Sequence, residues 1–234
     1  MHNPNLTKTD IETAEQYRKA AEKGDADAQF ELGHMYGVGI GVPQDNTEAA
    51  RWYRKAAEQG NVWAQDNLGV LYAMGAGVPK DYAEAAKWME KAANKGHPTA
   101  QRHLGNMYAD GYHYQQDEVE AARWYRKAAE QGHPKAQFSL GNVSHMGVGV
   151  PQSSADAAQW FTKAAWQGHV EAQHNLSVMY ARGDGVSQDY IESLIWALLS
   201  AKGGYKKAKE LCDRLLANMT DEQIDEARQR TRVS

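Results

Sequence analysis

Paired acidic residues and nine histidines are the side chains of this 234-residue chain that could do chemistry. Four Asp/Glu pairs share a three-residue spacing, as in Asp45 with Glu48 and Asp81 with Glu84. Two neighbouring carboxylates suit general acid–base catalysis, but a pair that recurs at this spacing is more typical of the first turn of a helix. We therefore assign no catalytic residue, and we do not expect an enzyme.

The histidines raise the question of a metal site. His97, His133 and His169 occupy one position of a 36-residue period. Neighbouring units of a helical stack lie ~10 Å apart. Their histidines are therefore too far apart to share one metal ion, whose bonds are ~2 Å long.

The glycine-rich stretch 37–41 resembles a phosphate-binding loop, but it follows a predicted helix and recurs along the chain, which favours a structural turn. We expect neither a metal nor a cofactor.

Composition restricts the partners and the compartment. The net charge is −4 and the pI about 6.1, so the basic surface that nucleic acid requires is not expected. No run of 18 apolar residues predicts membrane insertion, and Cys212, the single cysteine, allows no internal disulfide. The first ten residues lack a signal-peptide pattern. This predicts a cytoplasmic protein, or a periplasmic or secreted one if a signal peptide has been removed.

The elements that position these residues come from an internal repeat. The thirteen residues EAARWYRKAAEQG occur at 48–60 and again at 120–132, two periods of 36 apart. The dipeptide Ala-Gln begins at five positions with the same period, and a Leu follows each Ala by four residues. Such a period is typical of a solenoid, in which each unit buries its apolar face on the next one. The five dipeptides begin at Ala28, Ala64, Ala100, Ala136 and Ala172.

Each repeat predicts two helices. Ala28, Leu32 and Tyr36 share one face of the first helix, and Ala49, Trp52 and Tyr53 share one face of the second. Residues such as Asp45 are expected as N-caps with Glu three positions later reaching back, and residues such as Gly60 as C-terminal caps. The recurring mid-helix glycines, such as Gly33, indicate a close approach between helices.

The expected fold class is all-α: a right-handed α/α superhelical solenoid of five helix-pair repeats with a helical cap at each end. Residues 1–8 are expected to be a flexible N-terminus. A cap helix over 10–23 begins with Thr9-x-x-Glu12 as its capping box, and residues 205–234 form the C-terminal cap, with Cys212 buried at a Leu position. The solenoid spans 9–204, with repeats that begin near 25, 61, 97, 133 and 169.

The repeated unit closely resembles the Sel-1-like repeat, a relative of the tetratricopeptide repeat. The resemblance covers about residues 9–231 and is carried by stretches such as AQDNLGVLYAMGAGVPKDYAEAAKWMEKAANKGH. It implies an α-solenoid whose first helices line a concave surface. It also implies an adaptor that holds another protein or a peptide segment, as most members of that family do.

Recognition is expected where the first helices vary from repeat to repeat. Aromatic and Arg side chains are the usual anchors of protein interfaces; an alternative is that some of these residues fill gaps between first helices. The candidates are Phe30, His34, Trp63, Asp66, Asn67, Arg102, Asn106, Lys135, Phe138, Asn142, His174 and Arg182.

The third repeat departs from the others at its turn. Its residues Tyr112, His113 and Tyr114 replace the usual Gly-Val-Pro sequence, either as an edge contact for a partner or as local drift in which Tyr114 fills the Val slot. The resulting prediction is a monomeric, non-enzymatic adaptor. The alternatives are an enzyme or small-ligand binder with a site assembled across repeats, and a self-associating structural protein.

These predictions imply a fold that needs no ion and no disulfide. Treatment with EDTA or with a reductant should leave the melting temperature unchanged, because the expected core is apolar and the single thiol is buried. Differential scanning calorimetry checks this, and a fall of several degrees with EDTA would reveal a structural ion.

Overall fold

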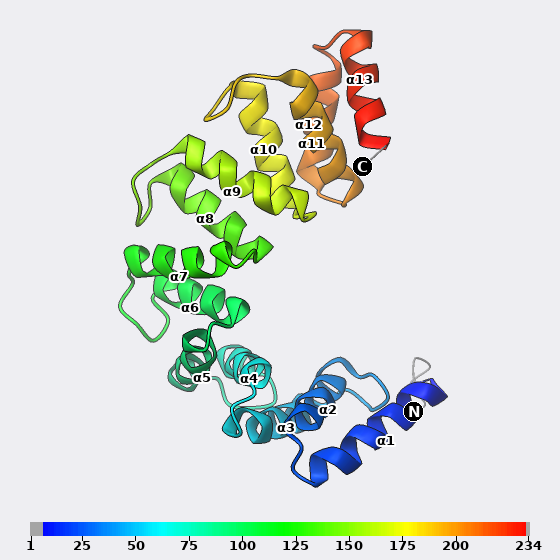
Figure 1. The fold of residues 1–234 in the computed structure, drawn as a ribbon, viewed down its shortest axis with the longest axis vertical. Helices are drawn as coiled ribbons and strands as arrows, with labels where there is room; N and C mark the ends of the chain where they lie inside the picture. The colour runs from blue at the N-terminus through cyan, green and yellow to red at the C-terminus, as the bar shows by residue number, and fades with distance from the viewer. Residues whose placement is uncertain (1–6, 233–234) are drawn as a thin grey trace. The chain divides into compact units, whose positions relative to one another are not determined.

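The computed structural model describes residues 7–232, and these contain thirteen α-helices and no strand (Figure 1). Residues 1–6, most of the predicted flexible N-terminus, lie outside the described residues. Two compact units divide the chain, unit 1 up to Gln116 and unit 2 from Asp117. Unit 1 contains α1 (Lys8–Glu22), α2 (Ala26–Val38), α3 (Asn46–Glu58), α4 (Val62–Met74), α5 (Tyr82–Asn94) and α6 (Pro98–Asp110). Unit 2 contains α7 (Glu118–Glu130), α8 (Pro134–Met146), α9 (Ser154–Trp166), α10 (Val170–Arg182), α11 (Tyr190–Lys202), α12 (Lys206–Leu216) and α13 (Asp221–Arg232).

Within unit 1, and from α7 to α12 in unit 2, every helix packs on the next one along the chain, and α13 packs on α11. This arrangement confirms the predicted all-α solenoid of helix pairs. No helix among residues 7–232 has the length and apolar character needed to cross a membrane.

Small and branched residues of the repeat form the core. The repeated Ala and Leu of the first helices are buried, with Ala64 and Leu68 of α4 both 0% exposed. Ala49, Tyr53, Ala85 and Met89 from the flanking second helices belong to the same cluster. Alanine at these sites lets the helices approach closely, and the few large side chains fill the remaining space.

The Gln of each Ala-Gln dipeptide links one repeat to the preceding one. All five are buried, and in each the side-chain amide donates to a carbonyl near the end of the preceding second helix. Gln29 donates to Ala21 and Gln65 to Ala57, both at 3.0 Å. Gln101, Gln137 and Gln173 do the same for Ala93, Ala129 and Ala165 at 3.0–3.2 Å. Each of these carbonyls also accepts from the backbone amide of the glycine three residues on, as Ala21 does from Gly24 at 3.1 Å. The glutamine is therefore a second donor that ties the helix end to the next repeat, and the bond gives the buried side-chain amide its partner.

The repeated mid-helix glycine makes room for a large side chain of the second helix. A Cβ on Gly33 would lie 2.8 Å from the Tyr53 ring, and one on Gly141 would lie 2.6 Å from the Phe161 ring. The predicted close approach is therefore confirmed, with a ring rather than a second backbone as the nearest group. The fifth repeat has Ser177 in place of this glycine, and position 197, where the ring would stand, carries alanine. The Ser177 hydroxyl donates to the Ser193 carbonyl at 2.6 Å, and the Ser193 hydroxyl donates to the Ser177 carbonyl at 2.8 Å.

The predicted caps of the second helices are present, but their reciprocal half is not. Asp45 accepts from the amides of Thr47 and Glu48, and Gly60 follows the helix with a φ of 95°. The Glu48 carboxylate, which we expected to reach back to the cap, pairs forward with Arg51 at 3.3 Å. The full capping box appears at α13, where Thr220 and Gln223 each accept from the other's amide at 3.4 and 3.0 Å.

The N-terminal helix begins earlier than predicted. It starts at Lys8, and its N-cap is Thr7, which accepts from the Asp10 amide at 3.1 Å, so the assignment of Thr9-x-x-Glu12 as the capping box was wrong. The extra residues add helical hydrogen bonds such as the one from the Ile11 amide to the Thr7 carbonyl. At the other end Cys212 is buried as predicted, and burial raises the pKa of its thiol to about 11.

The three histidines of the repeat are helix caps. The Nδ1 atoms of His97, His133 and His169 accept from the backbone amide three residues on, at 3.1–3.4 Å, at the start of α6, α8 and α10. Asn61 performs the same task for α4 with its side-chain oxygen. Among residues 7–232 no three His, Cys, Asp or Glu side chains are grouped to hold a metal ion.

A core truncation tests the local character of this packing. Leu68→Ala should lower the free energy of unfolding by about 2–5 kcal/mol, because it leaves a cavity beneath a fully buried side chain. Amide hydrogen exchange should rise most in α3, α4 and α5. Met74→Ala, on the same helix at a side chain that is 69% exposed, is the control and should cost under ~0.5 kcal/mol. An equal increase in amide exchange throughout the chain would contradict the expectation that each repeat is stabilised mainly by the repeats next to it.

The histidine caps predict a stability that depends on pH. Burial lowers the pKa of His97 and of His169, with Asp66 and Glu171 opposing the shift. A depressed pKa means that the unfolded chain binds more protons, so the free energy of unfolding should fall as the pH drops below about 6.5. Protonation of Nδ1 also removes the cap acceptor.

The double variant His97→Asn, His169→Asn introduces the residue that caps α4. It should lose less of its free energy of unfolding at low pH than the wild-type protein does. Urea unfolding near pH 7.5 and near pH 5 measures it, with His34→Asn at an exposed histidine as the control. An unchanged difference between the two pH values in the double variant would show that other groups cause the acid sensitivity.

Candidate functional site

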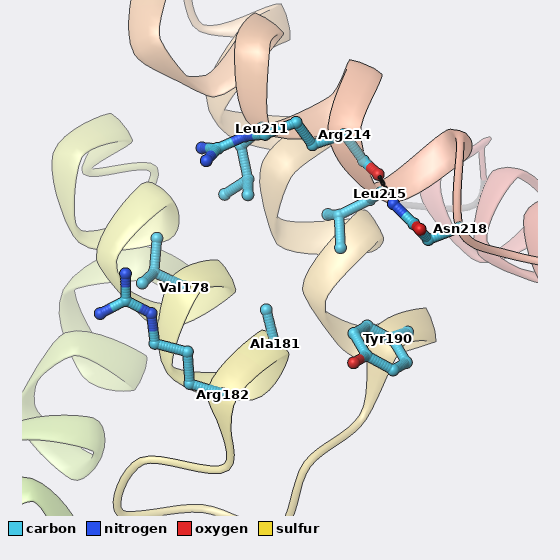
Figure 2. A pocket seen from close by; sticks show the side chains of 8 residues that line it. All are labelled: Val178, Ala181, Arg182, Tyr190, Leu211, Arg214, Leu215 and Asn218. Atoms are coloured by element: carbon cyan, nitrogen blue, oxygen red, sulfur yellow. Dashed lines mark hydrogen bonds between the residues drawn. The ribbon is translucent and has the colours of Figure 1, made fainter.

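A cleft lies between α10 and α12, two first helices of unit 2. It measures about 470 Å³. Figure 2 shows Val178 and Arg182 on the α10 wall and Leu211 and Arg214 on the α12 wall. Ala181 is part of the lining, and the buried side chains of Leu211 and Leu215 form an apolar floor. Tyr190 and Asn218 complete the lining.

Two arginines give this cleft a positive charge. Arg182 and Arg214 are both exposed, and within residues 7–232 neither has a carboxylate within salt-bridge distance. His174 lies nearby, and its pKa is lowered by burial first and then by the charges of Lys207 and Arg214. An apolar floor beside unpaired guanidinium groups suits a ligand that carries both an apolar side chain and a carboxylate.

A second cleft adjoins the first. It measures about 280 Å³ between α8 and α10, and it shares Val178 and Arg182 with the α10–α12 cleft. His145, Asn175 and Asp184 are among its other lining residues, and Asn175 donates to Asn142 at 3.4 Å. The two clefts therefore form one surface across α8, α10 and α12, which we call the unit 2 surface.

The charge of the unit 2 surface is reinforced by its helices. Together α8, α10 and α12 contain six Lys or Arg residues and three Asp or Glu residues. The first helices of unit 1, α2, α4 and α6, contain one Arg and four Asp or Glu residues. The two units thus present first helices of opposite net charge, although the protein as a whole is acidic.

Unit 1 has a smaller and more apolar cleft between α4 and α6. It measures about 260 Å³ and is lined in part by Met74, Met89 and Met107. His103 also lines it, and its Nδ1 lies 2.8 Å from Asp66 Oδ1. An Asp that holds a His is half of a catalytic triad, but the residues that line this cleft include no Ser, Thr or Cys to serve as the nucleophile.

Three residues in one row of the predicted binding residues lie between consecutive first helices. The row is Phe30, Asp66, Arg102, Phe138 and His174, and three of the five contact the N-cap of the next first helix. Asp66 lies 4.0 Å from His97, Phe138 stacks on His169 at 4.6 Å, and His174 lies 5.1 Å from Tyr205. Phe30 contacts Tyr53 at 5.9 Å. The contacts of Asp66, Phe138 and His174 fit the alternative that some of the predicted binding residues fill gaps between first helices.

Asp66 departs most from the expected exposed position. It is 3% exposed, because α4 turns this side chain toward α6, where His97 and His103 surround its carboxylate. Burial of a carboxylate is costly without such partners, so the sequence supplies two imidazoles. Trp63, one turn away, remains 54% exposed and rests the edge of its ring on His97 at 4.2 Å.

The remaining candidates vary in exposure. His34, Lys135 and Arg182 are exposed, whereas Asn106 and Asn142 are half-buried. Asn67 is half-buried and hydrogen-bonds Tyr53, whose pKa burial raises to about 12.

At the unusual turn of the third repeat, Tyr114 packs against the same core cluster as Val78 and donates to Glu90 at 2.6 Å. Tyr112 is 43% exposed and stacks on Tyr82. His113 adopts a φ of 70°, a value that the other repeats reach with glycine.

Sequence reasoning missed the α12 wall of the unit 2 surface. Residues 205–234 were assigned as a cap, so Leu211, Arg214 and Leu215 were not considered. The signal was present: Arg214 lies one period of 36 after Val178 and two after Asn142, in a row already chosen for its variability. Continuation of the register into the sixth first helix would have included it.

Comparison with known proteins places this arrangement in a family. Residues 17–25, 26–61, 64–97, 98–133, 134–169 and 170–205 match the Sel1 repeat. The protective antigen c5321 of uropathogenic Escherichia coli, whose structure displays an SLR fold, is 34% identical with a TM-score of 0.72. That match covers 93% of this chain and 56% of the antigen, so the chain spans little more than half of that protein.

A Sel1 repeat protein from Oxalobacter formigenes is also 34% identical, with a TM-score of 0.73 over 86% of this chain and 88% of that one. No curated protein matched the chain. The repeat matches most of the described helices, and the helix pairs, caps and buried glutamines recur in the same register. The chain belongs to the Sel1 repeat family.

Proposed function

We propose that this protein is a non-enzymatic adaptor that binds a segment of another protein on the unit 2 surface. Sel1 repeats commonly serve as protein-interaction scaffolds, which supports the general class. The observation that carries the finer proposal is the α10–α12 cleft, where Arg182 and Arg214 flank an apolar floor without a carboxylate partner among the described residues.

The chemistry of the cleft defines the segment. A guanidinium pairs with a carboxylate through two parallel hydrogen bonds, and such bonds are about twice as strong as those between neutral groups. The floor of Leu211, Leu215 and Val178 offers apolar area for one or two side chains. We therefore expect a segment in which an Asp or Glu side chain, or a terminal carboxylate, stands near a Leu-like or aromatic residue.

The proposal takes the protein to act as a monomer in the cytoplasm, with one binding surface per chain. Light scattering of the purified protein checks the first part, and a stable oligomer without ligand would favour the self-associating alternative instead.

Charge reversal tests the unit 2 surface. A random peptide display library selected on the wild-type protein should enrich peptides that combine acidic and apolar residues. The double variant Arg182→Glu, Arg214→Glu should bind those peptides at least tenfold more weakly, about 1.4 kcal/mol, because two anchors then repel the carboxylate. Fluorescence anisotropy with a labelled selected peptide measures the change.

The matched control changes the same charge elsewhere. Arg123→Glu, Arg126→Glu alters two exposed arginines of α7, a second helix, and should leave the affinity unchanged. Equal weakening by both double variants would reduce the effect to net charge. Enrichment of peptides with no acidic preference would contradict the proposed chemistry.

A further inference from the structure

A tyrosine of the first helix holds an arginine in the first two repeats. Arg18 of α1 donates from Nη2 to the Tyr36 hydroxyl at 2.8 Å, and Arg54 of α3 donates to the Tyr72 hydroxyl in the same way. The guanidinium of Arg54 also lies 5.6 Å from the centre of the Tyr72 ring. The repeat therefore contains a slot for a guanidinium between one second helix and the tyrosine of the next first helix.

The third and fifth repeats retain the tyrosine but not the arginine, with Glu90 before Tyr108 and Thr162 before Tyr180 at these registers. Only in the fifth repeat is the replacement a short side chain. The short Thr162 side chain turns back to its own helix and donates to the Ala158 carbonyl at 2.7 Å. A cleft of about 630 Å³ lies at this place, lined by Thr162, Tyr180 and residues of α9 and α11.

Aromatic rings enclose this cleft. Trp166 is 71% exposed, at a register where the other second helices carry Glu, Asn or Lys. Its ring meets that of Trp196 edge to face, with centres 5.1 Å apart and planes at 87°. The two indole rings therefore stand beside the vacated guanidinium slot, and the face of an indole is the aromatic surface that attracts a cation most strongly.

The Trp of the second helix normally makes a cation–π contact with a Lys of the same helix. In four repeats a Lys three residues later lies over the ring, with Nζ 3.8–4.2 Å from the centre, as for Lys163 over Trp160. At Trp196 the corresponding residue is Leu199. Two cation positions of the repeat, one on the tyrosine and one on the tryptophan, are thus without their usual side chain around the same cleft.

Two carboxylates add negative charge. Asp189 and Glu192 line the cleft, and together with burial they raise the pKa of Tyr180. Both have partners: Asp189 Oδ1 accepts from the amides of Ile191 and Glu192, and Glu192 pairs with Arg230 of α13. A cation that enters the cleft therefore competes with Arg230 for Glu192.

We propose that this cleft of unit 2, between Trp166, Tyr180 and Trp196, binds an arginine side chain of a partner protein. The repeat's own occupant is a guanidinium, which can stack on an aromatic ring and donate to a tyrosine hydroxyl at the same time. An ammonium group is a compact charge and cannot do both in the plane of the slot. The site does not depend on Arg182 or Arg214 and is separate from the proposed function.

The test uses the full chain and a minimal probe. The capped peptide acetyl-Gly-Arg-Gly-amide is titrated while the indole N–H signals of Trp166 and Trp196 are followed by NMR, with each signal assigned by Trp→Phe substitution. Both signals should shift and saturate. The corresponding lysine peptide should bind several-fold more weakly, and equal binding of the two peptides would overturn the assignment to arginine.

Two variants use residues that the repeat itself supplies. Thr162→Arg restores the arginine of the first two repeats and should abolish binding by filling the slot from within. Trp166→Asn introduces the residue of α5 at that register and should weaken binding by about 2- to 30-fold, the range for losing a cation–π contact of 0.5–2 kcal/mol. Arg230→Gln should tighten binding by removing the internal competitor.

The control is Trp63→Asn, at an exposed tryptophan of unit 1, which should not alter the affinity. Trp166→Asn changes an exposed side chain, so the test survives if Thr162→Arg fails to fold. Arginine binding that is unaffected by Thr162→Arg in a folded protein, or by Trp166→Asn, would overturn the proposal. Arg182→Glu, Arg214→Glu should leave this binding intact, so failure here and failure of the adaptor proposal are distinguishable.

Discussion

The hydrogen bond from a buried glutamine to the end of the preceding helix is the interaction on which the stacking depends. A solenoid must place the last turn of one helix against the side of another, and a polar side chain buried at that junction needs a partner. Gln29, Gln65 and their counterparts each donate to a carbonyl of that last turn, which also accepts from the backbone amide of the glycine after the helix. Since a buried polar group left without a partner costs about 1–3 kcal/mol, the glutamine and the carbonyl must stay aligned at every junction, and the alanine beside the glutamine allows the close approach.

The sequence predicted the framework because the framework is periodic. Helix positions, the Asp45-type caps and the role of Gly33 follow from residues that must satisfy the same neighbours in every repeat. The predicted start of α1 was wrong, because Thr7-x-x-Asp10 matches the capping pattern as well as Thr9-x-x-Glu12 does and was not considered. Only the three-dimensional structure shows that the earlier one adds a hydrogen-bonded turn.

The binding surface was harder to predict because its residues do not recur. Asp66 and His174 vary between repeats, but they vary as pairs with the residues that cap the next helix, and such pairing is not visible in a single row of the alignment of repeats. Arg214 was overlooked for the opposite reason: it lies in register, but in a segment that had been assigned to a cap. The vacated arginine slot could be found only by combining the register, in which Thr162 stands where α1, α3 and α7 carry Arg, with the structure, which shows the cleft around it.

The thirteen residues shared by 48–60 and 120–132 have a consequence for the length of the array. A chain in which one of these stretches was joined to the other would lose or gain two whole repeats, 72 residues, without any change in the sequence of the shared helix. The joint would fall inside one continuous helix, and the first helix that followed would still bring the Ala, Gln, Leu and Gly that the joint requires. The repeated framework thus allows a change in copy number in steps of 72 residues, while the fifth repeat, with its Ser177 and Ala197, lies beyond the shared stretches and stays unaltered.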